Sequence, residues 1–145
     1  MNKKELDFIL QEGEGLKIEF KEGINGIDKE IVAFANSDGG RIFLGINDQN
    51  KIKGIGITNK LKSQIQDIAR NCEPSIKIIL EEFENILIIN ILEGRDKPYK
   101  CSSGFYLRQG PNSQKMDRNE ILDFAIDEGK IKFDEQINND FIYPN

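Results

Sequence analysis

Residues 33–48 read AFANSDGGRIFLGIND and join the end of a helix to a tight turn and then to a strand. The apolar residues Ile27, Ile31 and Phe34 recur at helical spacing, and the helix that they predict should end near Gly39. The run RIFLGI that follows is almost continuously apolar, which is typical of a central strand covered on both faces. The stretch therefore predicts a buried strand with a helix packed against its sheet.

The chain on either side of this stretch continues the mixture of helices and strands. A short helix should end at QEGEG, and the alternation in LKIEFK predicts a strand with a buried face and a charged face that carries Glu19. KIKGIGI, residues 51–57, is expected to form a short returning strand after the turn NDQNK, and Thr58 to cap a third helix. Residues 75–83 and 85–93 should form an antiparallel hairpin, and FYLRQG should be the last strand. A fourth helix should begin at the capping pair Asp117 and Glu120 and end at Gly129. Four helices and about six strands predict an α+β fold, with a mixed, mainly antiparallel sheet and the helices packed on it.

The length of 145 residues predicts one domain, which we assign to residues 1–129. Residues 130–145 are acidic and aromatic without clear periodicity, and we expect an acidic tail or the start of a linker to a further domain. No apolar run approaches the roughly 20 residues that span a bilayer, and the N-terminus lacks the pattern of a signal peptide. We therefore expect a cytoplasmic protein that does not enter a membrane.

The net charge of −5 is unevenly distributed. Residues 119–145 hold seven carboxylates and two lysines, which accounts for the whole of it. Residues 95–118 hold six basic and two acidic side chains, a local charge of +4 that could face a polyanion. A solvated loop is the alternative explanation of this basic segment.

Three carboxylates form the first candidate site: Glu14, Glu19 and Asp48. Glu14 lies between two glycines in backbone that is free to turn toward Glu19, and Asp48 follows the RIFLGI strand. If that strand pairs with LKIEF, the three could converge and hold Mg²⁺ or Mn²⁺, ions that support phosphodiester cleavage. The alternative is three unrelated surface acids. Zinc is not expected, because the chain has no histidine and its two cysteines lie 29 positions apart.

The second candidate site is basic. Arg108 and Lys115 flank the Gly-Pro turn of YLRQGPNSQKM, aromatic side chains lie nearby, and Lys97 belongs to the same segment. Such residues suit a phosphate backbone with an unstacked base, and together with Lys21 we predict that they contact nucleic acid. A β-turn with Phe105 and Leu107 in the core is the alternative, and it explains the aromatic residues about as well. The glycines around residues 39–56 form neither of the usual nucleotide-binding motifs, so an ATPase is not expected.

These segments resemble the Schlafen AlbA-type domain, also labelled a divergent AAA-like or DNA-binding domain of prokaryotic transcriptional regulators. The resemblance rests on EGLKIEFK, on residues 27–55, on RDKPY and on FYLRQGPNSQKM, and it covers residues 12–128. It implies an α+β fold and contact with nucleic acid. In the Schlafen branch that cleaves transfer and ribosomal RNA the active site is a carboxylate trio, which the sequence matches at Glu14, Glu19 and Asp48.

The leading hypothesis is a nucleic-acid-binding domain of a transcriptional regulator, without a preference for DNA or RNA. The first alternative is a metal-dependent endoribonuclease acting on structured RNA. The second is a regulatory or oligomerisation module that binds no nucleic acid, in keeping with the acidic pI of about 4.9. Vertebrate Schlafens pair two such lobes into a clamp, and a homodimer of this chain would supply a second lobe.

Overall fold

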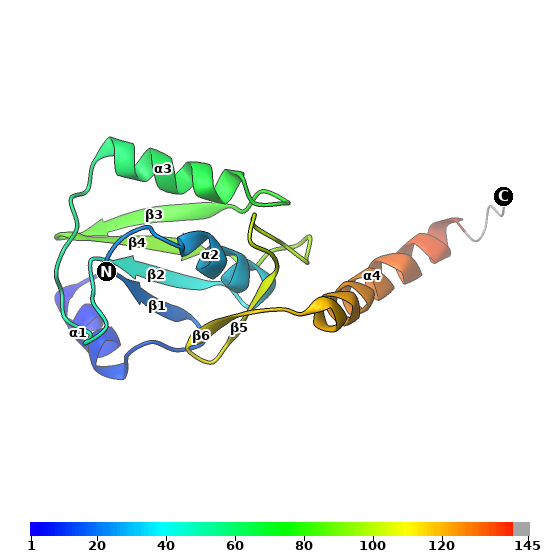
Figure 1. Cartoon of the computed structure of the whole chain (residues 1–145), viewed down its shortest axis with the longest axis horizontal. Helices are drawn as coiled ribbons and strands as arrows, with labels where there is room; N and C mark the ends of the chain where they lie inside the picture. Colours follow the sequence, from blue (N-terminus) through cyan, green and yellow to red (C-terminus); the bar gives the residue numbers. More distant parts are fainter. Residues whose placement is uncertain (141–145) are drawn as a thin grey trace.

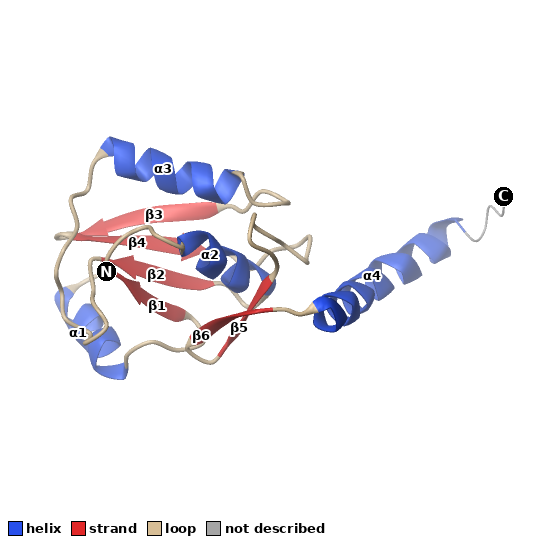
Figure 2. Ribbon diagram, in the orientation of Figure 1, coloured by secondary structure: helices blue, strands red, loops and turns tan. Residues whose placement is uncertain are grey.

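The computed structural model describes residues 1–140 and contains four helices and six strands in that part of the chain (Figures 1 and 2). The helices are α1 (Lys3–Glu12), α2 (Ile27–Asn36), α3 (Asn59–Arg70) and α4 (Arg118–Asp140). The strands are β1 (Ile18–Lys21), β2 (Gly40–Leu44), β3 (Ile78–Phe83), β4 (Ile86–Ile91), β5 (Tyr106–Gln109) and β6 (Asn112–Lys115). The predicted α+β class is confirmed.

Four of the strands form one sheet in the order β1-β2-β4-β3. β1 and β2 are parallel, whereas β2 with β4 and β4 with β3 are antiparallel. The predicted hairpin of β3 and β4 is confirmed, as is the burial of β2, in which Ile42, Phe43 and Leu44 are all fully buried. The parallel register sets Glu19 beside Ile42, at the edge of the sheet that β1 forms.

Helices cover both faces of this sheet. α2 and α3 pack on one face, where Phe34, Ile42 and Ile65 belong to the larger core cluster. α1 packs on the other face, where Leu6 and Phe43 belong to a smaller one. The caps predicted for two helices are present, because the side chain of Thr58 accepts the Leu61 N–H, and Asp117 and Glu120 exchange two hydrogen bonds.

The remaining two strands pair only with each other and form a separate antiparallel hairpin, β5–β6. The sequence predicted one strand here, because the polar residues 112–115 lack an apolar alternation. The strand predicted for KIKGIGI is wrong, since residues 51–57 form only an isolated bridge between Ile46 and Ile52. The predicted end of α4 at Gly129 is wrong, since the helix continues to Asp140, so that the domain boundary placed at residue 129 falls inside α4. Figure 1 shows α4 extending away from the sheet. None of the helices in the described part of the chain has the length and apolar character needed to span a membrane.

Candidate nucleic-acid interface

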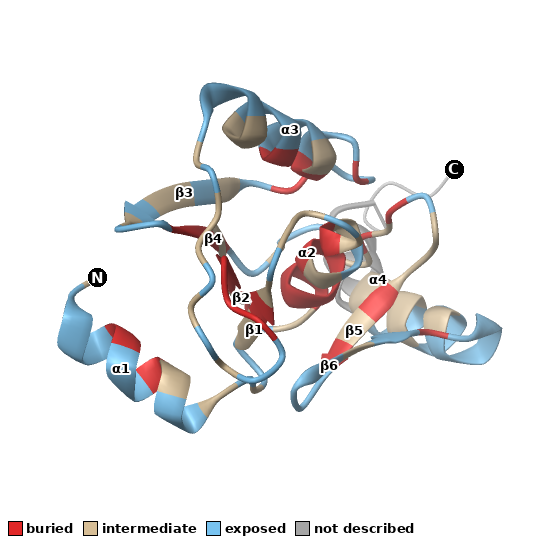
Figure 3. Ribbon diagram, turned by 60° about the vertical axis from the view of Figure 1, so that its left-hand side comes forward, coloured by how far each residue is buried: buried red, intermediate tan, exposed pale blue. Residues whose placement is uncertain are grey.

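The β5–β6 hairpin packs against α2 and the residues that precede β1 (Figure 3). Gly110 occupies its turn with a φ of 57°, a conformation that glycine adopts without strain. Cross-strand partners share a face, so Tyr106 and Lys115, and likewise Arg108 and Ser113, belong to one side of the hairpin. On this side Tyr106 and Arg108 are buried, which makes it the face directed toward the domain.

Arg108 attaches the hairpin to β1. Its guanidinium donates to the carbonyl of Gly15 from Nε at 3.2 Å and from Nη2 at 2.9 Å, and from Nη2 to the carbonyl of Ile18 at 2.8 Å. Nη1 donates to Glu19 Oε1 at 2.7 Å and to Ser113 Oγ at 3.0 Å. These five interactions match the donor capacity of a guanidinium, so its hydrogen bonds are satisfied within the protein.

The environment of Arg108 corrects the prediction that it lies on a phosphate-binding surface. Its side chain has 0% exposure, and its guanidinium carbon lies 4.6 Å from the centre of the Phe34 ring. A phosphate could reach the guanidinium only by displacing existing bonds. Arg108 is therefore a structural link between β5, β1 and α2. The alternative interpretation of this segment placed Phe105 and Leu107 in the core, whereas the structure buries the opposite face of the strand, Tyr106 and Arg108.

Glu14 and Glu19 are brought together, as the carboxylate hypothesis required. Glu14 Oε2 accepts the backbone N–H of Phe20 at 3.0 Å, which holds the Glu14 side chain against β1. Burial, followed by a hydrogen bond from Glu14, raises the pKa of Glu19 to about 8, although Arg108 opposes this rise. Glu19 is therefore partly buried between an acid and a base, and not exposed as the alternation of LKIEFK predicted.

Asp48 does not complete a metal site with the two glutamates. It is exposed in the turn that follows β2, and among the described residues no three metal-ligating side chains form a group that could hold an ion. β1 and β2 do pair, as the hypothesis assumed. Glu19 aligns with Ile42, in the middle of β2, whereas Asp48 lies beyond Leu44, the last residue of that strand. In this conformation the two glutamates supply two of the three carboxylates that the hypothesis requires for Mg²⁺ or Mn²⁺.

The three predicted lysines lie in different surroundings. Lys21 ends β1 and forms an ion pair of 3.7 Å with Glu30, while Lys97 follows β4 and forms one of 2.7 Å with Glu93. Because β4 runs antiparallel to β2, and β2 parallel to β1, these two lysines lie at opposite ends of the sheet. Lys115 is exposed at the base of the hairpin. The predicted residues therefore do not form one continuous basic surface.

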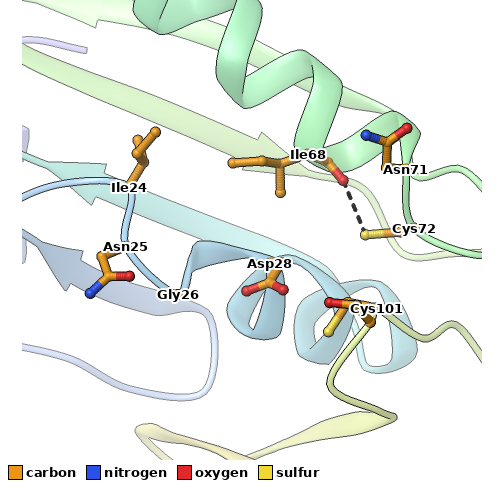
Figure 4. Close-up of a pocket in the computed structure, with 9 residues that line it drawn as sticks. Ile24, Asn25, Gly26, Asp28, Ile68, Asn71, Cys72 and Cys101 are labelled. Carbon is orange, nitrogen blue, oxygen red and sulfur yellow. Dashed lines mark hydrogen bonds between the residues drawn. The ribbon is translucent and has the colours of Figure 1, made fainter.

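A cavity of about 460 Å³ lies away from the hairpin tip, where the end of α3 approaches the start of α2. Cys72 and Cys101 line it, and both are free and buried (Figure 4). Cys72 Sγ donates to the carbonyl of Ile68 at 3.3 Å, and burial raises the pKa of its thiol to about 12. Its low content of thiolate at neutral pH identifies Cys72 as a packing residue.

The family model for "Schlafen, AlbA_2" matches residues 14–117 of the chain. The chain belongs to the Schlafen AlbA_2 family. The matched range begins at Glu14 and ends at Asp117, so the family domain contains the whole four-stranded sheet and the hairpin.

A solved structure shares the fold at low sequence identity. The DIP2311 protein from Corynebacterium diphtheriae has a TM-score of 0.56 at 16% identity, over 78% of this chain and 24% of that protein. The chain thus spans about a quarter of that relative's length. The N-terminal domain of a RecG-related protein from Nitrosomonas europaea has a TM-score of 0.47 at 24% identity, over 79% of this chain and 90% of that one.

Two features of this family domain were not singled out from the sequence: a segment without acidic residues, and Lys100 within it. Residues 97–116 contain no aspartate or glutamate, although the chain has 25 carboxylates, and this acid-free segment includes the exposed Lys115 and the 43% exposed side chain of Lys100. Both lysines border the turn at residues 101–104, because Lys100 precedes Cys101 and the Lys115 side chain passes over Gly104. The sequence shows this segment as a gap between Asp96 and Asp117, but a charge count over residues 95–118 includes both aspartates and hides the gap.

Proposed function

We propose that this domain binds nucleic acid through the acid-free segment, residues 97–116, which forms the β5–β6 hairpin and the loop leading to it. The observation that carries the proposal is the absence of carboxylates from this segment in an otherwise acidic chain. An acidic protein can approach a phosphate backbone only where its own negative charge is locally absent. Membership of the Schlafen AlbA_2 family supports the same proposal.

Lys100 and Lys115 are the phosphate contacts that this surface offers. Lys115 is exposed, and Lys100 has one ion pair, at 3.8 Å to Glu73, whose side chain is 76% exposed. Exposed pairs of this kind contribute little energy, so a phosphate can replace the carboxylate at small cost. Lys97 is less available, because its side chain is 14% exposed and holds Glu93 at 2.7 Å. Lys21 lies at the other end of the sheet and is not part of the proposed surface.

Binding measured against salt concentration tests the proposal. A fluorescent 30-base-pair DNA duplex and an RNA duplex of the same sequence are titrated with the wild type, with Lys100→Ala/Lys115→Ala and with Lys51→Ala/Lys53→Ala. The control pair is exposed, carries the same charge and lies beyond the opposite end of β2. If each lysine contacts one phosphate, the first variant loses about two units of the slope of log K against log salt.

The control variant should keep both the wild-type affinity and the wild-type slope. Equal losses in the two variants would show that only net charge matters, and would contradict the proposed surface. Failure of the wild type to bind either duplex at low salt would contradict nucleic-acid binding itself. The alternative of a regulatory or oligomerisation module would then be favoured.

A second candidate function is a metal-dependent nuclease, which the contact between Glu14 and Glu19 favours. The described conformation supplies two carboxylates to such a site, and Asp48 stands apart from them. Incubation with transfer RNA and Mn²⁺ beside a Glu19→Gln variant tests it. Cleavage by the wild type that the variant lacks would support the nuclease, and identical products would remove it.

A further inference from the structure

The outward face of the β5–β6 hairpin is built almost entirely from carboxamides. The register pairs Leu107 with Gln114 and Gln109 with Asn112 on the side opposite Arg108. Gln109, Asn112 and Gln114 are exposed, and Leu107 is half-buried beside them. Within the described part of the chain, the side chains of these three amide residues form no hydrogen bond with another protein group. The face therefore presents free donors and acceptors together.

We propose that this amide face enters the major groove of B-form DNA and reads the edges of the base pairs, while Lys100 and Lys115 contact the flanking phosphates. The inference rests on the proposed function and adds to it the class of nucleic acid and the basis of its recognition.

Size and chemistry both select the major groove. That groove is about 12 Å wide and admits a two-stranded ribbon, whose strands lie about 4.8 Å apart before side chains are added. Asparagine and glutamine form paired hydrogen bonds with the N6 and N7 positions of adenine, and an apolar side chain such as Leu107 suits the thymine methyl group. Strands of four residues extend about 13 Å, which matches about four base pairs.

The attachment of the hairpin supports a role in reading sequence. Four hydrogen bonds of the Arg108 guanidinium hold β5 to Gly15, Ile18 and Glu19, and the Arg108 backbone N–H donates to Ser37 Oγ at 3.1 Å. The ribbon is thereby ordered before it meets DNA, so binding does not have to order it. A loop used only for charge would not need such a fixed orientation.

Double-stranded RNA is the competing partner, and geometry disfavours it. The major groove of an A-form helix is deep and too narrow for side chains to read. The wide minor groove of RNA displays 2′-hydroxyl groups and is recognised mainly by shape. A ribbon with an amide face thus gains sequence-dependent contacts from B-form DNA that A-form RNA does not offer.

Selection from a DNA duplex library with 20 randomised base pairs tests the inference, using the wild type and the variant Gln109→Ala/Asn112→Ala/Gln114→Ala. The matched control, Gln11→Ala/Gln64→Ala/Gln66→Ala, removes three exposed amides on α1 and α3. The wild type and the control should enrich the same duplex sequences, which share a motif of about four base pairs that includes A·T pairs. The amide variant should bind the selected duplex at least about tenfold more weakly.

The same variants then bind an unselected DNA duplex and the RNA duplex of the selected sequence. The amide variant should match the wild type on unselected DNA within about twofold, since the phosphate contacts are retained. RNA bound as tightly as selected DNA, or wild-type enrichment that the amide variant reproduces, would overturn the inference. Either result would leave the proposed function intact if the lysine variant still loses affinity and salt slope. A lysine variant that binds like the wild type would contradict the proposed surface, and failure of the wild type to bind either duplex would contradict the function itself.

Discussion

Replacement of Arg108 by methionine should destabilise the domain by about 3 kcal/mol. The side chain is 0% exposed, and the substitution keeps much of its apolar stem while removing all five N–H donors. The carbonyls of Gly15 and Ile18 would then lose their hydrogen bonds to the guanidinium. Each of the two carbonyls keeps one backbone N–H partner, so the cost is that of the three lost guanidinium bonds, roughly 0.5–1.5 kcal/mol each, and the lost contact with Glu19 adds to this sum.

Urea unfolding followed by circular dichroism measures this difference, with Lys97→Met as the matched control. Lys97 also forms an ion pair of 2.7 Å, but its partner Glu93 is 52% exposed, and such pairs contribute at most about 1 kcal/mol. The Arg108 variant should lose several times more stability than the control. Equal losses of unfolding free energy in the two variants, or a loss below about 1 kcal/mol for Arg108→Met, would refute the structural role of the guanidinium. Arg108 would then again be a candidate for phosphate contact.

Three further predictions concern the interior. The pKa of Glu19 is about 8 in the folded chain against an ordinary 4.5, so its contribution to stability is complete below about pH 4.5 and is lost as the pH rises through 8. Glu14→Gln should lower the pKa of Glu19, and a ¹³C titration of the carboxyl carbons that showed no lowering would contradict the contact between them. Gly94→Ala should cost about 1–3 kcal/mol, because a Cβ there would overlap the Tyr99 ring, whereas Gly56→Ala, with open space around it, should stay within about 0.5 kcal/mol on thermal unfolding. Asn36→Ala should cost about 2–3 kcal/mol in urea unfolding, since Asn36 joins the Tyr99 N–H and carbonyl and the Tyr106 carbonyl by three buried bonds.

The parts of the fold that the sequence predicted correctly are those encoded by local patterns. The helical spacing that ends near Gly39, the apolar run of β2 and the capping residue Thr58 each depend on a few adjacent residues. Only β5 of the β5–β6 hairpin was predicted, because β6 consists of polar residues without an apolar alternation. The end of α4 was misplaced because a glycine inside a helix and a glycine after it look alike in one sequence.

The candidate site was harder to predict because its residues meet across long separations in the chain. Arg108 lies 89 positions from Glu19 and 93 from Gly15 along the chain, so no spacing rule connects them. A single clue was present, since strand alternation places Arg108 on the same face as Tyr106. A basic residue that shares a face with a buried aromatic side chain needs an internal acceptor, and Glu19 and the carbonyls before β1 provide it.

The most direct test of the account is a titration of the ¹⁵N-labelled domain with a mixed-sequence DNA duplex, followed by amide chemical shifts. The shifts should be concentrated in residues 97–116 and should be reversed as salt is added, with little change in residues 47–53 at the opposite end of β2. Shifts centred on residues 47–53, or none at low salt, would contradict the claim that the acid-free segment is a nucleic-acid-binding surface.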